Sequence, residues 1–135
     1  MDSTDEQILK ILQENARLSY VDIAAKLKIS EGTIRSRVKR MVDDGVIKKF
    51  TITTASKNIK ALIGVKIEIN INTSDVSNRI KEIEGVETVY EVSGEDDIAV
   101  IVNVMDSDEL NRIIEYIRGI EHTQSTKTSM ILKEL

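Results

Sequence analysis

The chain has no cysteine among its 135 residues. Disulfide bonds and thiolate metal sites are therefore excluded, and cysteine usage says nothing about the redox compartment. No run of eighteen apolar residues is present, which excludes a membrane-spanning helix. The first ten residues, MDSTDEQILK, are acidic and polar at first, unlike the basic and then apolar start of a secretory signal. These absences predict a cytoplasmic protein with no membrane among its partners.

Groups that carry out catalysis are also scarce. His122 is the only histidine, and we expect it in a loop as a structural or solvent-exposed side chain. The chain shows no cysteine nucleophile, no glycine-rich phosphate loop and no metal-ligand spacing. We therefore expect no enzyme activity, no catalytic residue, no metal site and no cofactor. The carboxylates at 95–97 leave a hard-cation site open as an alternative.

Charge is unevenly distributed, although the net charge is only −4. Residues 1–60 carry twelve basic and eight acidic side chains, a net charge of +4. Residues 61–135 carry seven basic and fifteen acidic ones, a net charge of −8. Such asymmetry favours a first half that contacts a polyanion and a second half that does not. Chance variation between two solvated surfaces is the alternative.

Three helices are predicted in the first half, followed by a β-type run over 46–54 that acts as a wing. The first helix begins near Asp5 and ends at Asn15, and Gly45 ends the third because glycine suits a left-handed backbone. The expected capping residues are, in chain order, Ser3 or Thr4, Ser19 and Ser30. Helical spacing of apolar residues defines the buried faces of the helices: Ile8, Ile11, Leu12, Ile23, Ala24, Leu27, Ile34, Val38, Met41 and Val42.

Only a tight turn at Lys28 and Ile29 separates the second helix from the third, which is the arrangement of a helix-turn-helix. A helix fits the major groove of DNA, where base edges display distinct donors and acceptors. Residues near the start of such a helix approach bases, while cations contact phosphates. The phosphate contacts position the protein on DNA without specifying its sequence. The predicted DNA-binding residues are Ser30 at the helix start, Thr33, Ser36 and Arg37 toward bases, and Arg35, Lys39, Arg40, Lys48 and Lys49 toward the backbone.

A basic helix face can also be merely solvated, and this alternative stays open. Three features favour DNA contact instead. The turn between the helices is short, a basic strand follows the third helix, and no balancing acid lies between Arg35 and Arg40.

Residues 5–50, DEQILKILQENARLSYVDIAAKLKISEGTIRSRVKRMVDDGVIKKF, closely resemble the N-terminal domain of the Lrp/AsnC family of prokaryotic transcription regulators, also called feast/famine proteins. The matching signals are DxxILxxLQENAR-S, IAxKLxIS and SxxTxRxRVxRMxxxGVIK. The resemblance implies a winged helix-turn-helix that binds double-stranded DNA. Gly32 departs from the pattern, because a larger or polar residue is commoner there, and glycine slightly weakens the start of a helix.

The second half follows a βαββαβ order, which is the ferredoxin-like, or split βαβ, plan. Apolar and polar residues alternate strictly over 63–71, which predicts a half-buried strand. The remaining predicted elements are a helix capped by 73–75, strands over 86–92 and 98–104 joined by a turn at 93–97, a helix capped by 106–108, and a strand over 126–132. The fold class is therefore α+β, with a winged helix-turn-helix before a ferredoxin-like domain.

Strand 98–104 is apolar on both sides, which predicts a central position in the sheet. If both helices pack on one face of the sheet, the other face presents an apolar patch of Ala99, Ile101 and Val89. An exposed apolar patch usually marks an interface, so we expect a second subunit to cover it. A small patch tolerated in water is the alternative.

The resemblance to the Lrp/AsnC family extends to this half, whose counterpart is called the regulation-of-amino-acid-metabolism domain. It implies dimers that assemble further through the sheet and that often bind amino acids or related metabolites between subunits. The family's Gly-Asp-x-Asp-like turn matches Gly94-Glu95-Asp96-Asp97, and its terminal Thr-x-Thr matches Thr126-Lys127-Thr128. Two departures are Glu95 in place of the usual aspartate, and His122-Thr123-Gln124 where a glycine usually precedes the last strand.

The chemistry of these residues suits an amino acid. Carboxylates at Glu95, Asp96 and Asp97 can accept charge-assisted hydrogen bonds from an α-ammonium group. Hydroxyl groups of Thr126 and Thr128 can complete the site. An ordinary acidic hairpin turn, in which Gly94 supplies a special backbone angle, is the alternative.

Together these patterns predict a sequence-specific DNA-binding transcription regulator that is modulated by an amino acid or a related small molecule. The expected parts are a DNA-binding domain at 1–54, a hinge at 55–60 and an oligomerisation and effector-binding domain at 61–135. We expect a homodimer that assembles into a higher oligomer and binds a roughly palindromic DNA site. Two other classes stay open: an effector-binding assembly partner whose basic helix contacts a protein, and a small-molecule-handling enzyme subunit.

Overall fold

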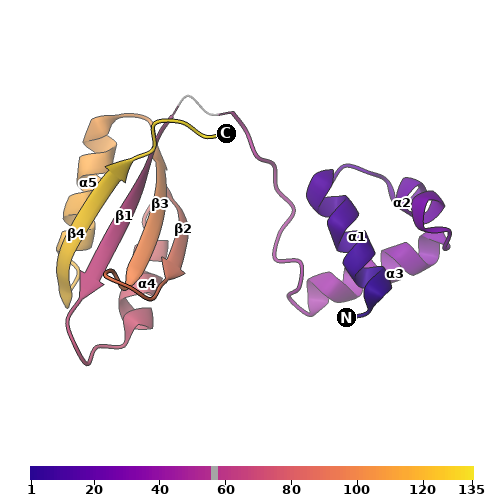
Figure 1. The fold of residues 1–135 in the computed structure, drawn as a ribbon, viewed down its shortest axis with the longest axis horizontal. Helices are drawn as coiled ribbons and strands as arrows, with labels where there is room; N and C mark the ends of the chain where they lie inside the picture. The colour runs from indigo at the N-terminus through magenta and orange to yellow at the C-terminus, as the bar shows by residue number, and fades with distance from the viewer. Residues whose placement is uncertain (56–57) are drawn as a thin grey trace. The chain divides into compact units, whose positions relative to one another are not determined.

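The computed structural model describes residues 1–55 and 58–135, which form two compact units, Met1–Ala55 and Ser56–Leu135. The first unit is helical and the second is built on a sheet (Figure 1). The predicted hinge at 55–60 includes residues 56 and 57, which lie outside the described residues, and its last two residues belong to the first strand. No helix among the described residues is both long and apolar enough to cross a membrane.

The helices of the first unit are α1 (Ser3–Glu14), α2 (Tyr20–Leu27) and α3 (Glu31–Asp43). Ser19 and Ser30 cap α2 and α3 as predicted. The predicted cap of α1 is wrong, because Asp2 takes that position. Its side chain accepts a hydrogen bond from the Asp5 N–H at 2.9 Å, and the Asp5 carboxylate accepts one from the Asp2 N–H at 3.3 Å. This reciprocal capping box satisfies two donors at the helix start.

The core of the first unit follows the predicted helical spacing. Ile8, Ile23 and Ile34, one from each helix, are fully buried against one another. Removing each such side chain from water contributes about 1.5–3 kcal/mol before the entropy of folding is counted. Gly45 follows α3 with φ of 76°, the left-handed conformation expected of it.

The predicted β-type run over 46–54 is wrong. Residues 46–55 form no strand, and Phe50 and Ile52 are mostly exposed. A strand needs a neighbouring strand for its backbone hydrogen bonds, and none of the described residues of the first unit provides one. The helix-turn-helix is present, but its wing is not a paired strand within this chain.

The second unit contains a four-stranded antiparallel sheet in the order β2-β3-β1-β4. The strands are β1 (Ile59–Ile67), β2 (Val86–Glu91), β3 (Ile98–Val104) and β4 (Thr123–Met130). With the two helices α4 (Thr73–Lys81) and α5 (Ser107–Arg118), this arrangement confirms the predicted ferredoxin-like plan. It also confirms that strand 98–104 is central.

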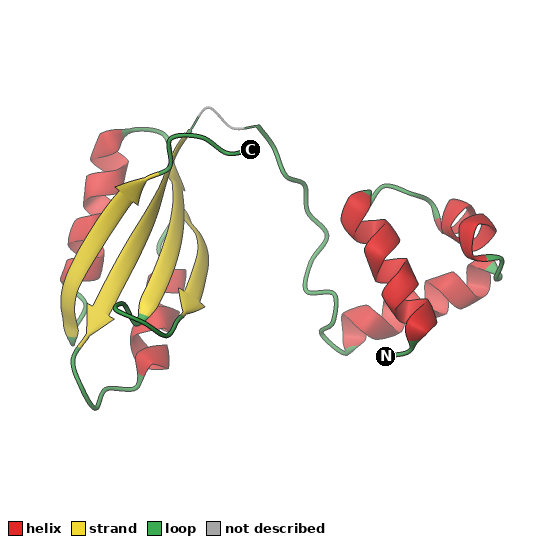
Figure 2. Cartoon of the chain, viewed as in Figure 1, coloured by secondary structure: helices red, strands yellow, loops and turns green. Residues whose placement is uncertain are grey.

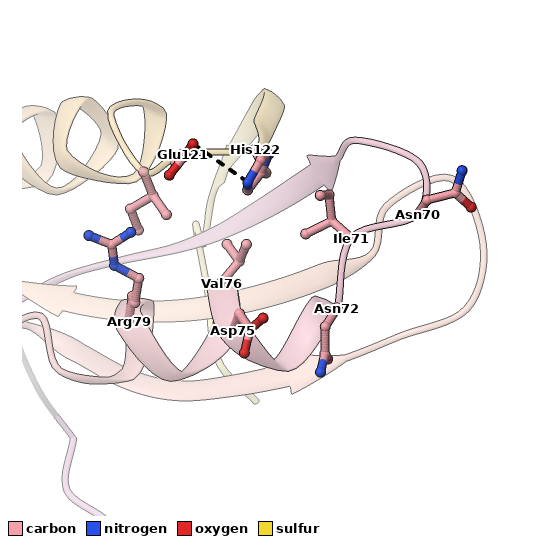
Figure 3. Close-up of a pocket in the computed structure, with 9 residues that line it drawn as sticks. Asn70, Ile71, Asn72, Asp75, Val76, Arg79, Glu121 and His122 are labelled. Atoms are coloured by element: carbon pink, nitrogen blue, oxygen red, sulfur yellow. Dashed lines mark ion pairs between the residues drawn. The ribbon is translucent and has the colours of Figure 1, made fainter.

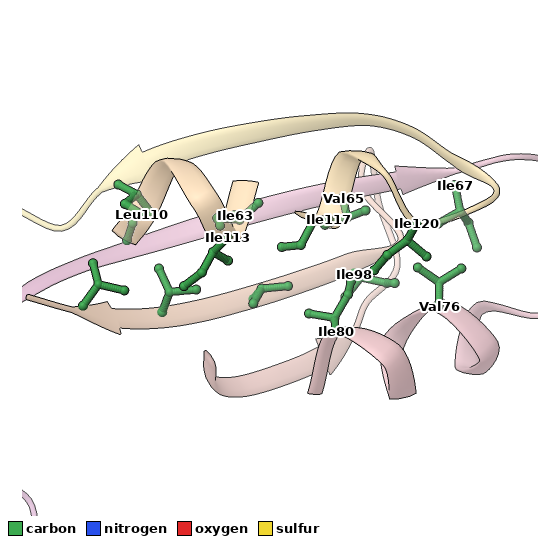
Figure 4. Close-up of a cluster of buried hydrophobic side chains, with 14 residues drawn as sticks. Ile63, Val65, Ile67, Val76, Ile80, Ile98, Leu110, Ile113, Ile117 and Ile120 are labelled. Carbon is green, nitrogen blue, oxygen red and sulfur yellow. The ribbon is translucent and has the colours of Figure 1, made fainter. Parts of the chain in front are cut away.

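Both helices cover the same face of the sheet (Figure 2). The side chains between these two helices and the sheet form a core of branched aliphatic residues (Figure 4). This core includes Ile63, Val65, Ile80, Ile98, Val100, Ile113 and Ile117. The alternation along β1 and β3 sends every second residue into this core.

The first strand lies earlier in the sequence than its alternation predicts. Ile69 continues the apolar pattern but is 87% exposed, and Asn70 turns the chain with φ of 67°. Pairing explains the end of the strand, because the last partner of β1 on β4 is Thr123, opposite Ile67. The last strand is likewise displaced and begins at Thr123 rather than Thr126.

Neither helix of the second unit covers the other face of the sheet (Figure 2). Leu62, Tyr90, Ala99 and Ile101 lie on it, at strand positions that alternate with the core residues. The predicted member Val89 is not among them, because it pairs with Val100 and packs against the core. A bulge between Val86 and Thr88 sets this register. We call this surface the open face.

Candidate DNA-binding and effector sites

The turn between α2 and α3 orients the predicted recognition helix. Lys28 ends α2 in the left-handed conformation, with φ of 57°, so the chain reverses within three residues. Ser30 then begins α3: its Oγ accepts a hydrogen bond from the Thr33 N–H at 3.1 Å and lies 2.8 Å from Thr33 Oγ1. Both hydroxyl groups therefore already share a hydrogen bond at the start of the helix.

No acid lies between Arg35 and Arg40 in sequence, yet each of the four cations of α3 forms an ion pair with an acid outside that stretch. Arg35 pairs with Glu31 one turn earlier, and Lys39 pairs with Asp43 at 2.8 Å. Arg37 and Arg40 pair with acids of α1 and its cap, about 35 residues away in sequence. Because these partners lie outside α3, the sequence of the helix alone does not reveal them.

Asp5 is the centre of the long-range cluster. Only 1% of Asp5 is exposed, and its carboxylate accepts hydrogen bonds from Arg37 at 3.0 Å and Arg40 at 3.2 Å. Arg37 also donates to Asp2 at 2.6 Å. We call Asp2, Asp5 and Arg37 the clamp, since they join the start of α1 to the middle of α3. Arg37 is only 25% exposed there.

The protonation of the clamp follows from these contacts. The hydrogen bond from Arg37, with help from the Asp5 N–H, lowers the pKa of Asp2 to about 2. Burial alone would raise the pKa of Asp5, but the hydrogen bonds from Arg37 and from the Asp2 N–H outweigh it, so this pKa is also lowered. The pKa of Arg37 is raised by its hydrogen bonds to Asp2 and Asp5. Both carboxylates are therefore ionised at neutral pH.

The remaining predicted DNA contacts are accessible. Arg35 and Lys39 have side chains 63% and 76% exposed, and exposed pairs one helical turn apart contribute only about 0.3–0.5 kcal/mol. Ser36 is exposed on the same helix, and Lys48 and Lys49 are exposed beyond it. Neither lysine has an ion-pair partner among the described residues. Arg35 also lies 5.4 Å from the ring centre of Tyr20, a cation–π contact that the sequence did not suggest.

The predicted effector turn is folded, but its carboxylates point to different partners. Glu95 lies 3.7 Å from Lys127. Asp96 lies over Gly64, where a β-carbon would come within 2.2 Å of Asp96 Oδ2. Asp97 Oδ2 accepts a hydrogen bond from the Ile67 N–H at 2.9 Å. Gly94 has φ of 132°, in the range that favours glycine.

The structure does not bring Thr126 and Thr128 to Asp96. These threonines lie opposite Val65 and Ile63 of β1, and directly opposed residues of antiparallel strands share a face. Both therefore lie on the helix-bearing side, where Thr126 Oγ1 accepts a hydrogen bond from Arg118 at 3.2 Å. Asp96 covers Gly64 on the open face, so the sheet separates the two halves of the predicted site within one subunit.

In residues 1–55 and 58–135, no three histidine or carboxylate side chains come together as possible metal ligands. The carboxylates at 95–97 are included in this statement; Glu95 lies near Lys127 and Asp97 accepts from the Ile67 N–H.

These features define a class: a helix-turn-helix protein with a separate ferredoxin-like domain. Known families match each part, namely winged helix-turn-helix DNA-binding domains over residues 1–48 and the Lrp/AsnC ligand binding domain over residues 60–135. The chain belongs to the Lrp/AsnC family, and it is a DNA-binding transcriptional regulator.

Individual relatives include a transcriptional regulator, a solved structure and part of an enzyme. The chain is 41% identical to the HTH-type transcriptional regulator LysM of Saccharolobus solfataricus, over 98% of this chain and 94% of the relative. The crystal structure of PH0061 superposes with a TM-score of 0.90 at 28% identity and covers 100% of this chain and 95% of that one. The chain also matches 26% of the homocitrate synthase of Sulfolobus acidocaldarius, at 37% identity over 99% of this chain.

Proposed function

We propose that α3 reads DNA through Thr33 and Ser36 and that Arg35, Lys39, Lys48 and Lys49 contact phosphates. The exposure of Ser36 and of the four cations supports the assignment, while Thr33 is half-buried at the start of the helix. The weak pairs of Arg35 and Lys39 can be replaced by phosphate oxygens at little free-energy cost. Ser30 contributes as the cap that fixes where α3 begins.

The clamp supports a positioning role for Arg37 in place of the base contact predicted from sequence. Its guanidinium is held between two carboxylates, one of them almost fully buried. If Arg37 moved away from Asp5, the buried negative charge of Asp5 would lose its closest positive partner, which is unfavourable. We propose that Arg37 positions α3 against α1, and that the more exposed Arg40 both supports the clamp and faces phosphates.

We propose that the regulator acts as a homodimer, which assembles further, on a roughly palindromic site. Apolar side chains on the open face support a subunit contact there, since a neighbouring copy would remove Leu62 and Ile101 from water. Two recognition helices related by twofold symmetry would then enter major grooves about one helical turn apart, or a multiple of that. The proposed parts are the domains 1–54 and 61–135 with a hinge at 55–60, acting in the cytoplasm where the DNA of a prokaryote lies.

We propose an amino acid or related metabolite as effector, bound through the carboxylates of 94–97. Thr126 and Thr128 can belong to the same site only across a subunit boundary, because the sheet separates them from Asp96 in one chain. Such an effector changes DNA affinity only if it binds two assembly states differently. Asp97→Ala is expected to abolish any amino-acid-induced change in oligomer size.

Selection of bound DNA from a random pool, with and without amino acids, tests the proposed function. A sequence-specific dimer is expected to enrich one motif with inverted symmetry, and an effector is expected to change its yield. Ser36→Ala should change the preference for bases within each half-site. Recovery of random sequences at low affinity would contradict the proposal and favour the alternative in which α3 contacts a protein.

A further inference from the structure

The second unit has a cavity of about 430 Å³ at the end of the sheet, between the start of α4 and the junction of α5 with β4 (Figure 3). Val76 and Ile120 provide its apolar wall, and Asp75, Arg79, Glu121 and His122 provide charged and polar groups. It is distinct from the turn at 94–97, which does not line it. A volume of this size falls in the range of small-molecule sites.

The charged groups around the cavity are of both signs. Asp75 and Arg79 lie one helical turn apart on α4, on the same side of the helix. Neither forms an ion pair among the described residues, although their spacing would permit one. The Arg79 side chain instead extends from α4 toward the α5–β4 junction, where Glu121 lies (Figure 3).

His122 is held at the opposite wall. Its Nδ1 lies 3.0 Å from Glu68 Oε2 and its Nε2 lies 3.7 Å from Glu121 Oε1, while its carbonyl accepts a hydrogen bond from the Glu68 N–H at 2.9 Å. The residue has φ of 75°, a left-handed conformation that favours glycine. A strained backbone of this kind persists only where its surroundings fix it, and such positions cluster at ligand sites.

We propose that this cavity binds a small zwitterion of the α-amino acid class within a single subunit. The Arg79 guanidinium matches a carboxylate in bidentate geometry, and Asp75 and Glu121 match an ammonium group. His122 adds a hydrogen-bonding wall, and Val76 and Ile120 accommodate the ligand side chain. Walls of both charge signs favour a zwitterion over a simple anion. The inference deepens the effector response proposed above by adding a ligand site that needs no second subunit.

Titration of the full-length ¹⁵N-labelled protein with each common L-amino acid, without DNA, tests the inference. We expect at least one amino acid to shift the Arg79 side-chain signal and the His122 signals saturably. Arg79→Gln is expected to weaken this binding at least tenfold. Lys81→Gln removes an exposed cation two residues further along the same helix, outside the cavity, and should bind like the parent.

Three results would overturn the inference: no amino acid shifts these signals, Arg79→Gln binds like the parent, or the shifts map to 94–97 and leave Arg79 and His122 unchanged. Because DNA is absent from the titration, the outcome is independent of the DNA selection. Loss of ligand binding here leaves DNA recognition intact as a proposal, and failure of the selection leaves the cavity site intact.

Discussion

The cations of α3 divide into two kinds by the burial of their partners. Arg35 and Lys39 form pairs in which both side chains are about half exposed or more, so water and salt screen them strongly. Arg37 contacts a carboxylate that is only 2% exposed. Arg40 contacts the same buried carboxylate, but its own side chain stays 57% exposed, whereas Arg37 is 25% exposed. Ion pairing therefore leaves three of the four cations of α3 accessible for the proposed DNA contacts.

Arg37→Ala is expected to lower the melting temperature of the first unit by several degrees, because Asp5 then loses its closest cation. Arg35→Ala removes an exposed pair on the same helix and should leave the melting temperature almost unchanged. Amide signals of α1 to α3, followed by NMR during heating of the full chain, measure both. Equal melting of the two variants would show that the clamp does not hold α3.

The lowered pKa values of the clamp predict an acid-sensitive first unit. The pKa of Asp2 is about 2 in the folded chain against an ordinary 3.8, so the unfolded chain binds more protons in this range. The stabilisation is therefore complete above about pH 4 and is lost as the pH falls toward 2. Asp2→Asn keeps a good helix cap but removes the charge, so its stability should vary less with pH there.

Denaturant unfolding of the first unit at a series of pH values measures this effect. Glu14→Gln removes an exposed carboxylate of the same helix and should keep the slope of the parent. A parent whose stability is constant between pH 4 and 2 would contradict the role of the clamp.

Lys48 tests the proposed phosphate contacts. Lys48→Ala is expected to weaken binding to operator and random DNA alike, because a phosphate contact carries no base information. The dependence of log affinity on log salt concentration should become shallower by roughly one phosphate contact. Lys10→Ala, an exposed cation on α1, is the control and should preserve both affinities. A selective loss of operator binding in Lys48→Ala would instead indicate a base contact.

At the scale of elements, local rules predicted part of what local hydrogen bonds decide. The predicted caps of α1 and α4 lie one or more residues too late, since Asp2 and Asn72 take these positions. Ser19, Ser30 and Gly45 end or begin helices through contacts a few residues away, and the structure confirms all three. The strand at 98–104 was identified as central because its residues are apolar on both sides. Helical and two-residue periodicities thus predicted the βαββαβ order and most of the core.

What sequence patterns missed depends on distant partners. The alternation up to Ile69 suits a strand, but a strand ends where its neighbours end, and β4 supplies no partner beyond Thr123. The run at 46–54 also has β-type residues, but no described residue of the first unit forms a strand beside it. Arg37 looked free because its acids lie in α1, and the predicted effector residues looked adjacent because sequence does not say which face of the sheet each one occupies.

Gly64→Ala tests how the open face holds the turn at 94–97. A β-carbon there would come within 2.2 Å of Asp96 Oδ2, so the Asp96 side chain has to move. Because Asp96 is a partly exposed side chain that can turn away, we expect a loss of less than about 1 kcal/mol in the unfolding free energy of the second unit, at the low end for overpacked sites. Adding Asp96→Ala should recover most of it, since the clash then disappears.

Gly32→Ala is the matched control for this substitution. A β-carbon at Gly32 meets nothing within 4 Å, and alanine favours the helix over glycine, so stability should be retained or increased. Equal losses in Gly64→Ala with and without Asp96→Ala would mean that Asp96 does not rest on Gly64.

At the scale of the whole molecule, the two sides of the sheet differ in what covers them. One side is sealed by α4 and α5, whereas Leu62 and Tyr90 on the open face are 39% and 54% exposed. Stable subunit contacts bury about 800 Å² on each partner, an area that a four-stranded sheet can supply. A twofold dimer would place the same face on both subunits and bring two α3 helices to one DNA site.

Leu62→Glu is therefore expected to reduce the mass in sedimentation equilibrium toward that of one chain, because two facing carboxylates would be taken from water without partners. Binding to a palindromic site should fall at least tenfold, while binding to an isolated half-site should stay near that of the parent, since α3 is unchanged. Ile69→Glu, at an apolar residue 87% exposed in a loop outside the sheet, should keep the parent's mass and affinity.

A Leu62→Glu protein with the parent's mass would move the subunit contact away from the open face. A monomeric parent that still binds the palindrome would require each α3 to recognise its half-site alone.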